Sequence, residues 1–298
     1  MLQVKTITIG TRGSDLAMWQ ANHVKSQLES IGQNVKIQII TTRGDRIQDL
    51  SFDKMEGKGF FTKEIEVALL NHDIDIAVHS HKDLETTPPE GLKIAAVSER
   101  ANPCELLLIR KSAHEPNALW ELKKNAVVGT SAARRKSQLL ALRLDVEIKD
   151  LRGNVPTRIE KLKSGDYDAI LLAKAGVDRL NLDLSDLVTV ELTPDEFVPA
   201  PAQGVLALQI REQDKELNEI LKQINDAEVQ KLVHLEREVL RLMDGGCQLP
   251  LGVYCDNKYV HVSYSDYALH ASRYFRFPYK DSPDFPSKIV EHLQHQQV

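Results

Sequence analysis

The feature that most constrains how this chain can fold is a strand–glycine–threonine–helix pattern that occurs twice. It is found first at Ile9-Gly10-Thr11 and again at Val128-Gly129-Thr130. Each copy is followed by a segment of helical periodicity and then by an apolar strand that starts near an acidic pair, at Asp73–Asp75 and Asp166–Asp168. Strands that alternate with helices in this way form open, mainly parallel sheets. The sequence therefore predicts two similar α/β domains.

The expected elements follow from apolar periodicity, capping residues and glycine stops. In the first half we expect strands at Val4–Ile9, Val35–Ile40 and Ile74–Val78, a helix capped by Ser14 that ends near Ile31, and a helix at Thr62–Asn71. In the second half we expect strands at Val127–Thr130, Val146–Leu151 and Asp168–Ala173, and helices at Arg134–Leu142 and Pro156–Leu162. A further strand at Val205–Ile210 is predicted to return to the first sheet.

Two joins, Glu99–Pro103 and the proline-stiffened Phe197–Gln203, are expected to cross between the domains and to form a hinge. The cleft between the domains is the expected ligand site. Beyond residue 227 the composition shifts, and six of the seven tyrosines lie beyond residue 250. This indicates a small α+β third domain. We expect domain boundaries at 1–100 with 203–223, at 104–198 and at 227–298.

Composition narrows the function classes. The chain has 298 residues, enough for two or three domains, and a net charge of −5 that argues against nucleic-acid binding. No apolar run approaches the roughly 18 residues of a membrane span, and the N-terminus has no secretory signal, so a cytoplasmic location is expected. The three cysteines do not predict a disulfide framework.

The start of each repeat is a candidate anion site. Thr11–Ser14 and Thr130–Ala132 each follow a strand and precede a helix, where backbone N–H groups and hydroxyls attract anions. Arg12, Arg134 and Arg135 add fork-shaped donors that match carboxylates. The alternative interpretation is simple helix capping beside surface arginines.

Three further arginines are expected at the carboxyl edge of the second sheet. Arg152 follows a strand, Arg158 lies in the first turns of the next helix, and Arg179 follows the strand after that. Ligands of α/β proteins bind at this edge. Solvated surface arginines remain the alternative for each of them.

The segment Val78–Asp83 ends an apolar strand and carries several reactive side chains. His79 and His81 lie two apart, but no third ligand is placed to complete a metal site, so we predict none. Asp83 is a candidate to stabilise a cation or move a proton. The alternative role for Asp83 is a turn cap.

Two loops complete the set of candidates. The stretch Gly44–Gly59 is interpreted as a lid, and Gly57–Phe61 lacks the spacing of a phosphate loop. Cys247 follows two glycines and precedes Leu249-Pro250, so an exposed thiol is expected that acts as a nucleophile or carries a covalent group. An unreactive loop thiol is the alternative.

Taken together, seven motifs resemble, in order and spacing, those of the porphobilinogen deaminase (hydroxymethylbilane synthase) family. They are Thr11–Ala17, Gly57–Phe61, Val78–Asp83, Gly129-Thr130-Ser131 with Arg134-Arg135, Leu151–Asn154, Leu172–Gly176 and Gly245–Pro250. The resemblance extends over nearly the whole chain.

The resemblance implies a transferase of tetrapyrrole (porphyrin and haem) biosynthesis. Such enzymes join four porphobilinogen molecules head to tail, release ammonia each time, and yield linear hydroxymethylbilane. The growing chain is anchored on a dipyrromethane cofactor, which the resemblance places on Cys247 as a thioether. It also implies two domains like periplasmic binding proteins, a third domain carrying the cysteine, and a monomer.

The same resemblance implies roles for individual residues. Asp83 is implied as the catalytic carboxylate, which stabilises the azafulvene cation left by loss of ammonia. Implied cofactor-binding residues are Cys247, Ser80, Lys82, Asp83, Thr130, Ser131, Arg134, Arg135 and Arg152. Implied substrate-binding residues are Arg12, Ser14, Arg152, Arg158 and Arg179. The acetate and propionate of each pyrrole unit explain the preference for bidentate arginine.

The sequence departs from the family pattern in places. Ala132 stands where many members have serine, Pro156 stands where a small residue is expected, and the tail after Leu251 matches poorly. Two rival functions are a non-catalytic anion-binding protein with the same two domains and a metal hydrolase using His79 and His81. A pure binder would need neither Asp83 nor Cys247.

Overall fold

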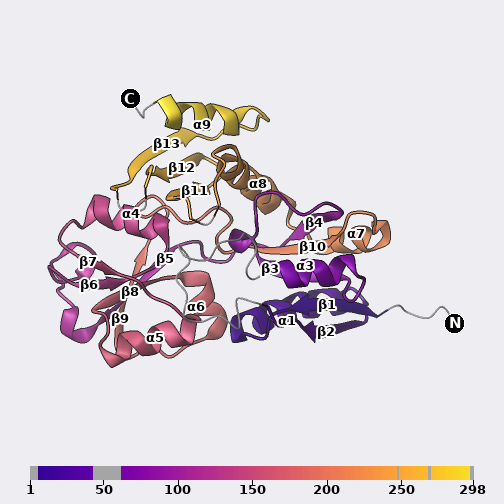
Figure 1. The fold of residues 1–298 in the computed structure, drawn as a ribbon, viewed down its shortest axis with the longest axis horizontal. Helices are drawn as coiled ribbons and strands as arrows, with labels where there is room; N and C mark the ends of the chain where they lie inside the picture. The colour runs from indigo at the N-terminus through magenta and orange to yellow at the C-terminus, as the bar shows by residue number, and fades with distance from the viewer. Residues whose placement is uncertain (1–5, 43–61, 247, 268–269, 296–298) are drawn as a thin grey trace. The chain divides into compact units, whose positions relative to one another are not determined.

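The computed structural model describes residues 6–42, 62–246, 248–267 and 270–295. The chain forms two compact units, one made of residues 1–101 and 205–231 and the other of residues 102–204 and 232–298. Figure 1 labels the helices and strands of both units. The predicted lid Gly44–Gly59, the Gly57–Phe61 motif and Cys247 lie outside the described residues, and the structure therefore leaves these three interpretations as predictions.

The first unit is built on a five-stranded sheet. Its strands are β1 (Ile7–Thr11), β2 (Val35–Ile39), β3 (Ile76–Ser80), β4 (Leu92–Val97) and β10 (Leu206–Arg211), in the order β2-β1-β3-β10-β4. β10 runs antiparallel to both of its neighbours, so one strand opposes the other four. The predicted return of Val205–Ile210 to the first sheet is confirmed.

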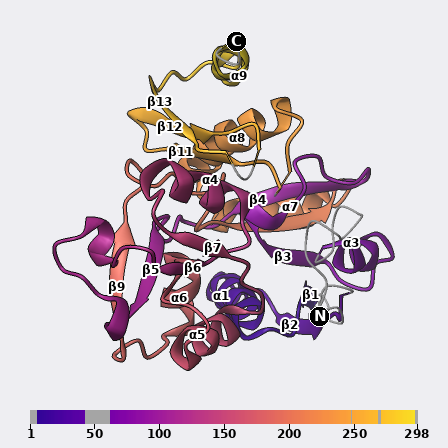
Figure 2. The ribbon, with the colours of Figure 1, turned by 60° about the vertical axis from the view of Figure 1, so that its left-hand side comes forward.

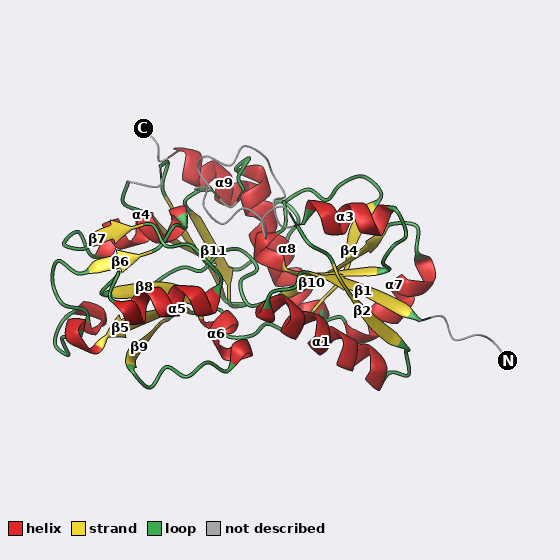
Figure 3. Ribbon diagram, turned by 60° about the horizontal axis from the view of Figure 1, so that its bottom comes forward, coloured by secondary structure: helices red, strands yellow, loops and turns green. Residues whose placement is uncertain are grey.

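Helices cover both faces of this sheet, as Figure 3 shows for α1 and α3. They are α1 (Asp15–Ser30), α3 (Lys63–Leu70) and α7 (Lys215–Leu221). The apolar stripe of α1, formed by Ala21, Val24 and Leu28, packs against Ile9 and Ile76. α3 packs in a separate cluster on the other face. The alternation of β3 explains this, because its successive side chains point to opposite faces.

The second sheet repeats the pattern of the first. Its strands are β5 (Glu105–Arg110), β6 (Val127–Gly129), β7 (Glu147–Lys149), β8 (Ala169–Ala173) and β9 (Leu187–Leu192), in the order β7-β6-β8-β5-β9. β5 again runs against its two neighbours. β6, which contains the second glycine, takes the same place in its sheet as β1 does in the first. The internal repeat predicted from the sequence is thus confirmed in the topology.

The helices of this sheet are α4 (Ala133–Leu142), α5 (Val155–Ser164) and α6 (Lys174–Leu180). Along β5, Leu107 and Ile109 belong to the cluster that includes α4, whereas Leu106 and Leu108 belong to the cluster that includes α5. A central strand buried on both faces is typical of such layered α/β sheets.

A small antiparallel sheet completes the second unit. It consists of β11 (Leu251–Cys255), β12 (Tyr259–Tyr264) and β13 (Arg273–Pro278), with α8 (Ala227–Leu242) and α9 (Phe285–His295) contributing to its core. Figure 2 shows α8 and α9 beside this sheet. The expected α+β region is confirmed. Because it shares one compact unit with the second sheet, the three-domain boundaries remain a prediction.

Some elements have no counterpart in the sequence expectation. In the two α/β parts of the chain these are the strands β4, β5 and β9 and the α-helices α6 and α7. They are short, and six or seven residues carry little periodicity. Over the described part of the chain, no helix has the length and apolar character needed to cross a membrane.

Candidate active site

In the first unit, four of the predicted site residues line one pocket. Arg12, Ser14, Ser80 and Asp83 face a cavity of about 100 Å³ at the carboxyl ends of β1 and β3. Parallel strands that end at one edge bring these residues together although almost 70 residues separate Ser14 from Asp83. A guanidinium, two hydroxyls and a carboxylate therefore converge on one small cavity.

The helix that follows β1 orients this pocket. Ser14 caps α1 by accepting a hydrogen bond from the backbone N–H of Ala17 at 3.4 Å, so its oxygen is partly engaged in capping. Gln20, a buried residue one turn further along α1, donates to Ser80 Oγ at 2.8 Å. This bond joins α1 to the end of β3 and fixes the position of Ser80.

Asp83 lies in a 3-10 turn, His81–Asp83, directly after β3. Its side chain is exposed, although it lines the pocket. Lys82 occupies the same turn, but among the described residues it is not one of those lining this cavity. A solvated carboxylate at the rim of a cavity can stabilise a nearby cation and exchange protons with a ligand.

The two histidines of this segment are both buried. His79 Nε2 lies 3.0 Å from Gln209 Oε1, and burial lowers the pKa of His79 to about 4. His79 also contributes to the wall of the pocket. Across the residues that the structure describes, no three His, Cys, Asp or Glu side chains group closely enough to hold a metal ion.

In the second unit, Thr130 and Ser131 lie between β6 and α4. Ser131 Oγ donates to the carbonyl of Leu151 at 3.0 Å and accepts from the N–H of Leu151 at 3.1 Å. These bonds connect the loop between β6 and α4 to the segment that carries Arg152. Thr130 is buried, and its Oγ1 accepts from the N–H of Ala132 at 3.3 Å. The alanine at position 132 makes no side-chain cap for α4.

Arg134 and Arg135, the predicted cofactor-binding arginines, are both buried at the start of α4. Both bind the carboxylate of Glu105: Arg134 Nη2 lies 2.5 Å from Oε1, and Arg135 Nη2 lies 2.7 Å from Oε2. Burial lowers the pKa of Arg134, while Glu105 acts in the opposite direction. The structure thus gives these arginines an internal partner, and their binding of a ligand stays a prediction.

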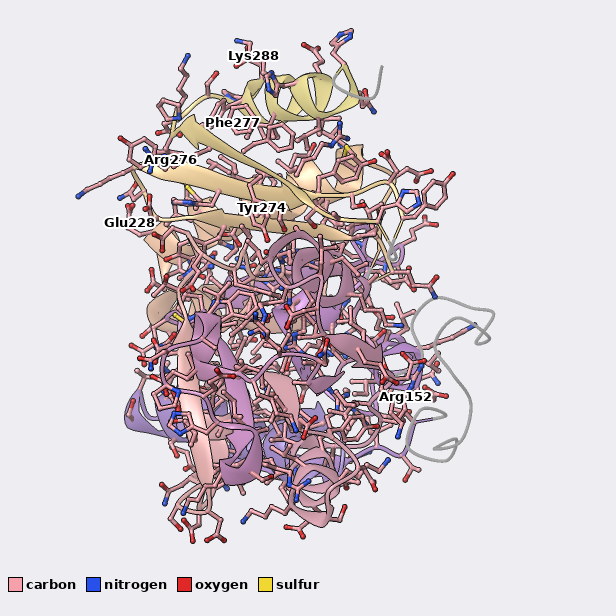
Figure 4. All side chains as sticks on the ribbon, turned by 90° about the vertical axis from the view of Figure 1, so that its left-hand side faces the viewer. Arg152, Glu228, Tyr274, Arg276, Phe277 and Lys288 are labelled. Carbon is pink, nitrogen blue, oxygen red and sulfur yellow. The ribbon has the colours of Figure 1, made fainter. Side chains whose placement is uncertain are left out.

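Two of the three remaining predicted arginines, Arg158 and Arg179, donate to backbone carbonyls. Arg158 Nε donates to the carbonyl of Gly153 at 2.7 Å. Arg179 Nη2 donates to the carbonyl of Gly204 at 2.8 Å, and burial lowers its pKa to about 10. Arg152 follows β7 and lies at the margin of the ribbon in Figure 4. Each of these arginines follows, or lies in the helix after, a strand of the second sheet.

The local structure around Arg152 and Arg158 fits the sequence. Asn154 caps α5 by accepting from the N–H of Thr157 at 2.9 Å, and Pro156 falls in the first turn, where a missing N–H costs nothing. The unexpected proline is therefore compatible with the helix that carries Arg158.

Two residues that take part in this architecture escaped the sequence prediction. Gln20 is buried in the middle of α1, and Glu105 begins an apolar strand. The available signal was a polar side chain in an apolar context, because a buried acid such as Glu105 needs a cationic partner. Arg134 and Arg135 provide that partner.

The described cysteines are Cys104 and Cys255, and both are buried thiols outside any disulfide. Burial raises the pKa of Cys104 to about 12, which makes its thiolate scarce at neutral pH. Burial of both thiols makes these two residues poor nucleophiles.

The donor set fits a ligand that carries several carboxylates. Arginine forks, hydroxyls and a lysine ammonium occur at the carboxyl edges of both sheets, and each can bind a carboxylate oxygen. Among the described residues that line the pocket, Asp83 is the carboxylate, and a carboxylate can balance positive charge on a ligand. This is the donor chemistry that a dipyrromethane with acetate and propionate side chains requires.

Comparison with known proteins agrees with this chemistry. Residues 7–219 match a family model described as porphobilinogen deaminase, dipyromethane cofactor binding domain. The porphobilinogen deaminase of Bacillus subtilis is 45% identical over 84% of this chain and 79% of its own length. That of Nitratiruptor sp. is 44% identical over 83% of this chain and 77% of its own length.

A solved structure also aligns with the chain at low sequence identity. The BvgS periplasmic VFT2 domain of Bordetella pertussis is 12% identical, with a TM-score of 0.43 over 74% of this chain and 86% of that one. The sequence identity to curated relatives, extending over more than four fifths of the chain, decides the assignment. This chain belongs to the porphobilinogen deaminase family.

Proposed function

We propose that this protein is a hydroxymethylbilane synthase, a transferase that condenses four porphobilinogen molecules head to tail and releases one ammonia per molecule added. The observation that carries the proposal is the pocket of the first unit, where Arg12, Ser14 and Ser80 converge with Asp83. An anion site beside a single solvated carboxylate matches a substrate with two carboxylates and a cationic reaction centre.

The residues of this pocket divide the work between binding and charge stabilisation. Arg12 binds a pyrrole carboxylate, with the hydroxyls of Ser14 and Ser80 as further donors. Loss of ammonia from porphobilinogen leaves an azafulvene cation, and the carboxylate of Asp83 stabilises this positive charge. Asp83 also accepts the proton that the attacking pyrrole carbon loses when the new carbon–carbon bond forms, and then gives it to the released ammonia or to solvent.

The dipyrromethane cofactor supplies the nucleophilic pyrrole end to which the incoming unit is joined. We propose that Cys247 carries it as a thioether. Thr130, Ser131, Arg134, Arg135 and Arg152 of the second unit, with Ser80, Lys82 and Asp83 of the first, would hold its carboxylates and pyrrole nitrogens. Ser131 supports this assignment because its bonds to Leu151 couple the α4 loop to the Arg152 segment.

Arg152, Arg158 and Arg179, together with Arg12 and Ser14, are proposed to bind the carboxylates of incoming substrate. The hydrogen bond from Arg158 Nε to the carbonyl of Gly153 fixes one nitrogen of the guanidinium, and this orients the planar group. A monomeric, cytoplasmic enzyme is part of the same proposal, and family membership supports it.

A quantitative product assay tests this function. The purified chain is incubated with porphobilinogen, and ammonia and linear tetrapyrrole are both measured. We expect four ammonia molecules for each hydroxymethylbilane formed. Binding of porphobilinogen without release of ammonia would favour the rival function, a non-catalytic anion-binding protein.

A further inference from the structure

The carboxylate of Glu105 is enclosed by the two arginines of α4. Glu105 is the first residue of β5, and its side chain is 0% exposed. Its Oε1 accepts from Arg134 Nη2 at 2.5 Å, and its Oε2 accepts from Arg135 at both Nη2, at 2.7 Å, and Nε, at 3.1 Å. One carboxylate therefore binds two neighbouring guanidiniums with separate oxygens.

Backbone carbonyls hold the other side of each guanidinium. Arg134 Nη1 donates to the carbonyl of Val198 at 2.9 Å, and Arg135 Nη1 donates to that of Leu171 at 2.9 Å. Each planar group is thus fixed at two points, which removes its rotation. Each Nη nitrogen carries two hydrogens, so a guanidinium held in this way can also donate to a second carboxylate.

The net charge of this cluster also favours the binding of an anion. Two guanidiniums and one carboxylate carry a joint charge of +1 in a buried setting, where an uncompensated pair of cations would be costly. Glu105 lowers their mutual repulsion without cancelling the attraction of the pair for an anion. An internal carboxylate of this kind keeps an anion site assembled before its ligand arrives.

We propose that Glu105 is a positioning residue of the cofactor site, which fixes the planes of Arg134 and Arg135 so that they are ready to receive the carboxylates of the dipyrromethane. The inference rests on the proposed function, since it takes that cofactor as the ligand. Glu105 acts through the arginines and does not itself touch the cofactor.

The test compares Glu105→Gln and Glu105→Asp with Asp168→Asn as a matched control. Asp168 is a carboxylate of the same unit that accepts from Lys123 Nζ at 2.8 Å and from the N–H of Val127 at 3.0 Å. Each full-length variant is produced without cofactor, its Tm is measured, and intact mass follows the growth of the pyrrole adduct during incubation with porphobilinogen.

We expect Glu105→Gln to acquire the adduct at least about tenfold more slowly than the unchanged protein, because misoriented charged donors lose most of their binding advantage. Glu105→Asp keeps the charge but retracts it by one methylene. It should acquire the adduct at a rate between those of Glu105→Gln and the unchanged protein. Asp168→Asn should load at the unchanged rate. In the loaded proteins, Glu105→Gln should lower kcat per adduct and leave KM for porphobilinogen within about twofold.

Loading of Glu105→Gln at the unchanged rate would overturn the proposal, as would equal slowing by Asp168→Asn. If Glu105→Gln does not fold, the comparison of Glu105→Asp with Asp168→Asn decides, and equal rates in those two variants would overturn it. Failure of the unchanged protein to acquire any adduct would instead refute the proposed function. The two failures are therefore seen in different samples.

Discussion

His79 Nε2 lies 3.0 Å from Gln209 Oε1 in the interior of the first unit, and Gln209 Nε2 donates to Glu66 Oε1 at 3.0 Å. Since the Gln209 oxygen accepts, His79 donates from Nε2. This bond favours the protonated imidazole, but burial of the ring outweighs it and favours the neutral form. Burial lowers the pKa of His79 to about 4 and raises that of Glu66.

The His79 arrangement predicts a loss of stability in mild acid. The folded-state pKa of about 4 lies below the ordinary value of 6.5, so the unfolded chain binds the proton more readily. The contribution of neutral His79 to the free energy of unfolding is complete above pH 6.5 and is lost as pH falls toward 4. Between pH 7.5 and 5.0 this amounts to roughly 2 kcal/mol of unfolding free energy.

Urea unfolding of the unchanged protein and of His79→Gln at these two pH values measures this difference. Glu66, whose raised pKa acts in the opposite direction, is present in both proteins, so the comparison isolates His79. The variant should lose about 2 kcal/mol less than the unchanged protein on acidification. Equal losses would show that His79 is not held neutral.

Asp83→Asn should keep the pocket and lose the reaction. The amide has the shape of the carboxylate but cannot balance the cationic intermediate, so kcat should fall by about 10²–10⁴. The pyrrole adduct should still be present by intact mass. Asp73→Asn, which changes another exposed carboxylate of the same unit, serves as the control. Turnover of Asp83→Asn near the unchanged rate would refute the catalytic role of Asp83.

Arg12→Ala should weaken substrate binding at the pocket of the first unit. Loss of one charge-assisted contact to a carboxylate costs about 1.5–3 kcal/mol, which lowers kcat/KM for porphobilinogen by roughly 10–100-fold. Arg12→Lys should recover only part of this, because lysine cannot bind a carboxylate with two parallel bonds. Lys36→Ala, which removes an exposed cation of β2 in the same unit, is the control, and an equal effect there would point to general damage.

Much of the fold could be predicted because the strand–glycine–helix repeat specifies it. The glycines of β1 and β6, the Ser14 cap and the return of β10 all follow from local patterns. The reversed direction of β5 does not, since nothing in the residues 105–110 records which way the strand runs within its sheet. Tertiary pairing with β8 and β9 decides that direction.

The candidate site likewise has features that the sequence predicts and features that it does not. Residues at the ends of strands, such as Arg12 and Asp83, could be placed together because parallel strands end at one edge. The enclosure of Arg134 and Arg135 by Glu105 could not, because their pairing joins residues some 30 positions apart through tertiary packing alone. Sequence patterns report which groups are present more reliably than which partner each group takes.

The second glycine of the repeat is required by close packing. A Cβ at Gly129 would lie 2.7 Å from Tyr167 Cδ1, and Tyr167 is held by a 2.6 Å hydrogen bond to the carbonyl of Asp150. Gly129→Ala should therefore destabilise the protein by about 1–3 kcal/mol in urea unfolding. Gly246→Ala, where a Cβ would meet no atom of the described residues within 4 Å, should have little effect. Equal stability of the two variants would contradict this packing.

The central claim is that this chain builds its product on a cofactor made from its own substrate and anchored at Cys247. The intact mass of the freshly purified protein tests it most directly. We predict a mass above that of the sequence by two pyrrole units, absent in Cys247→Ser and retained in Cys104→Ala and Cys255→Ala. Finding only the unmodified mass, with no gain after incubation with porphobilinogen, would contradict the account.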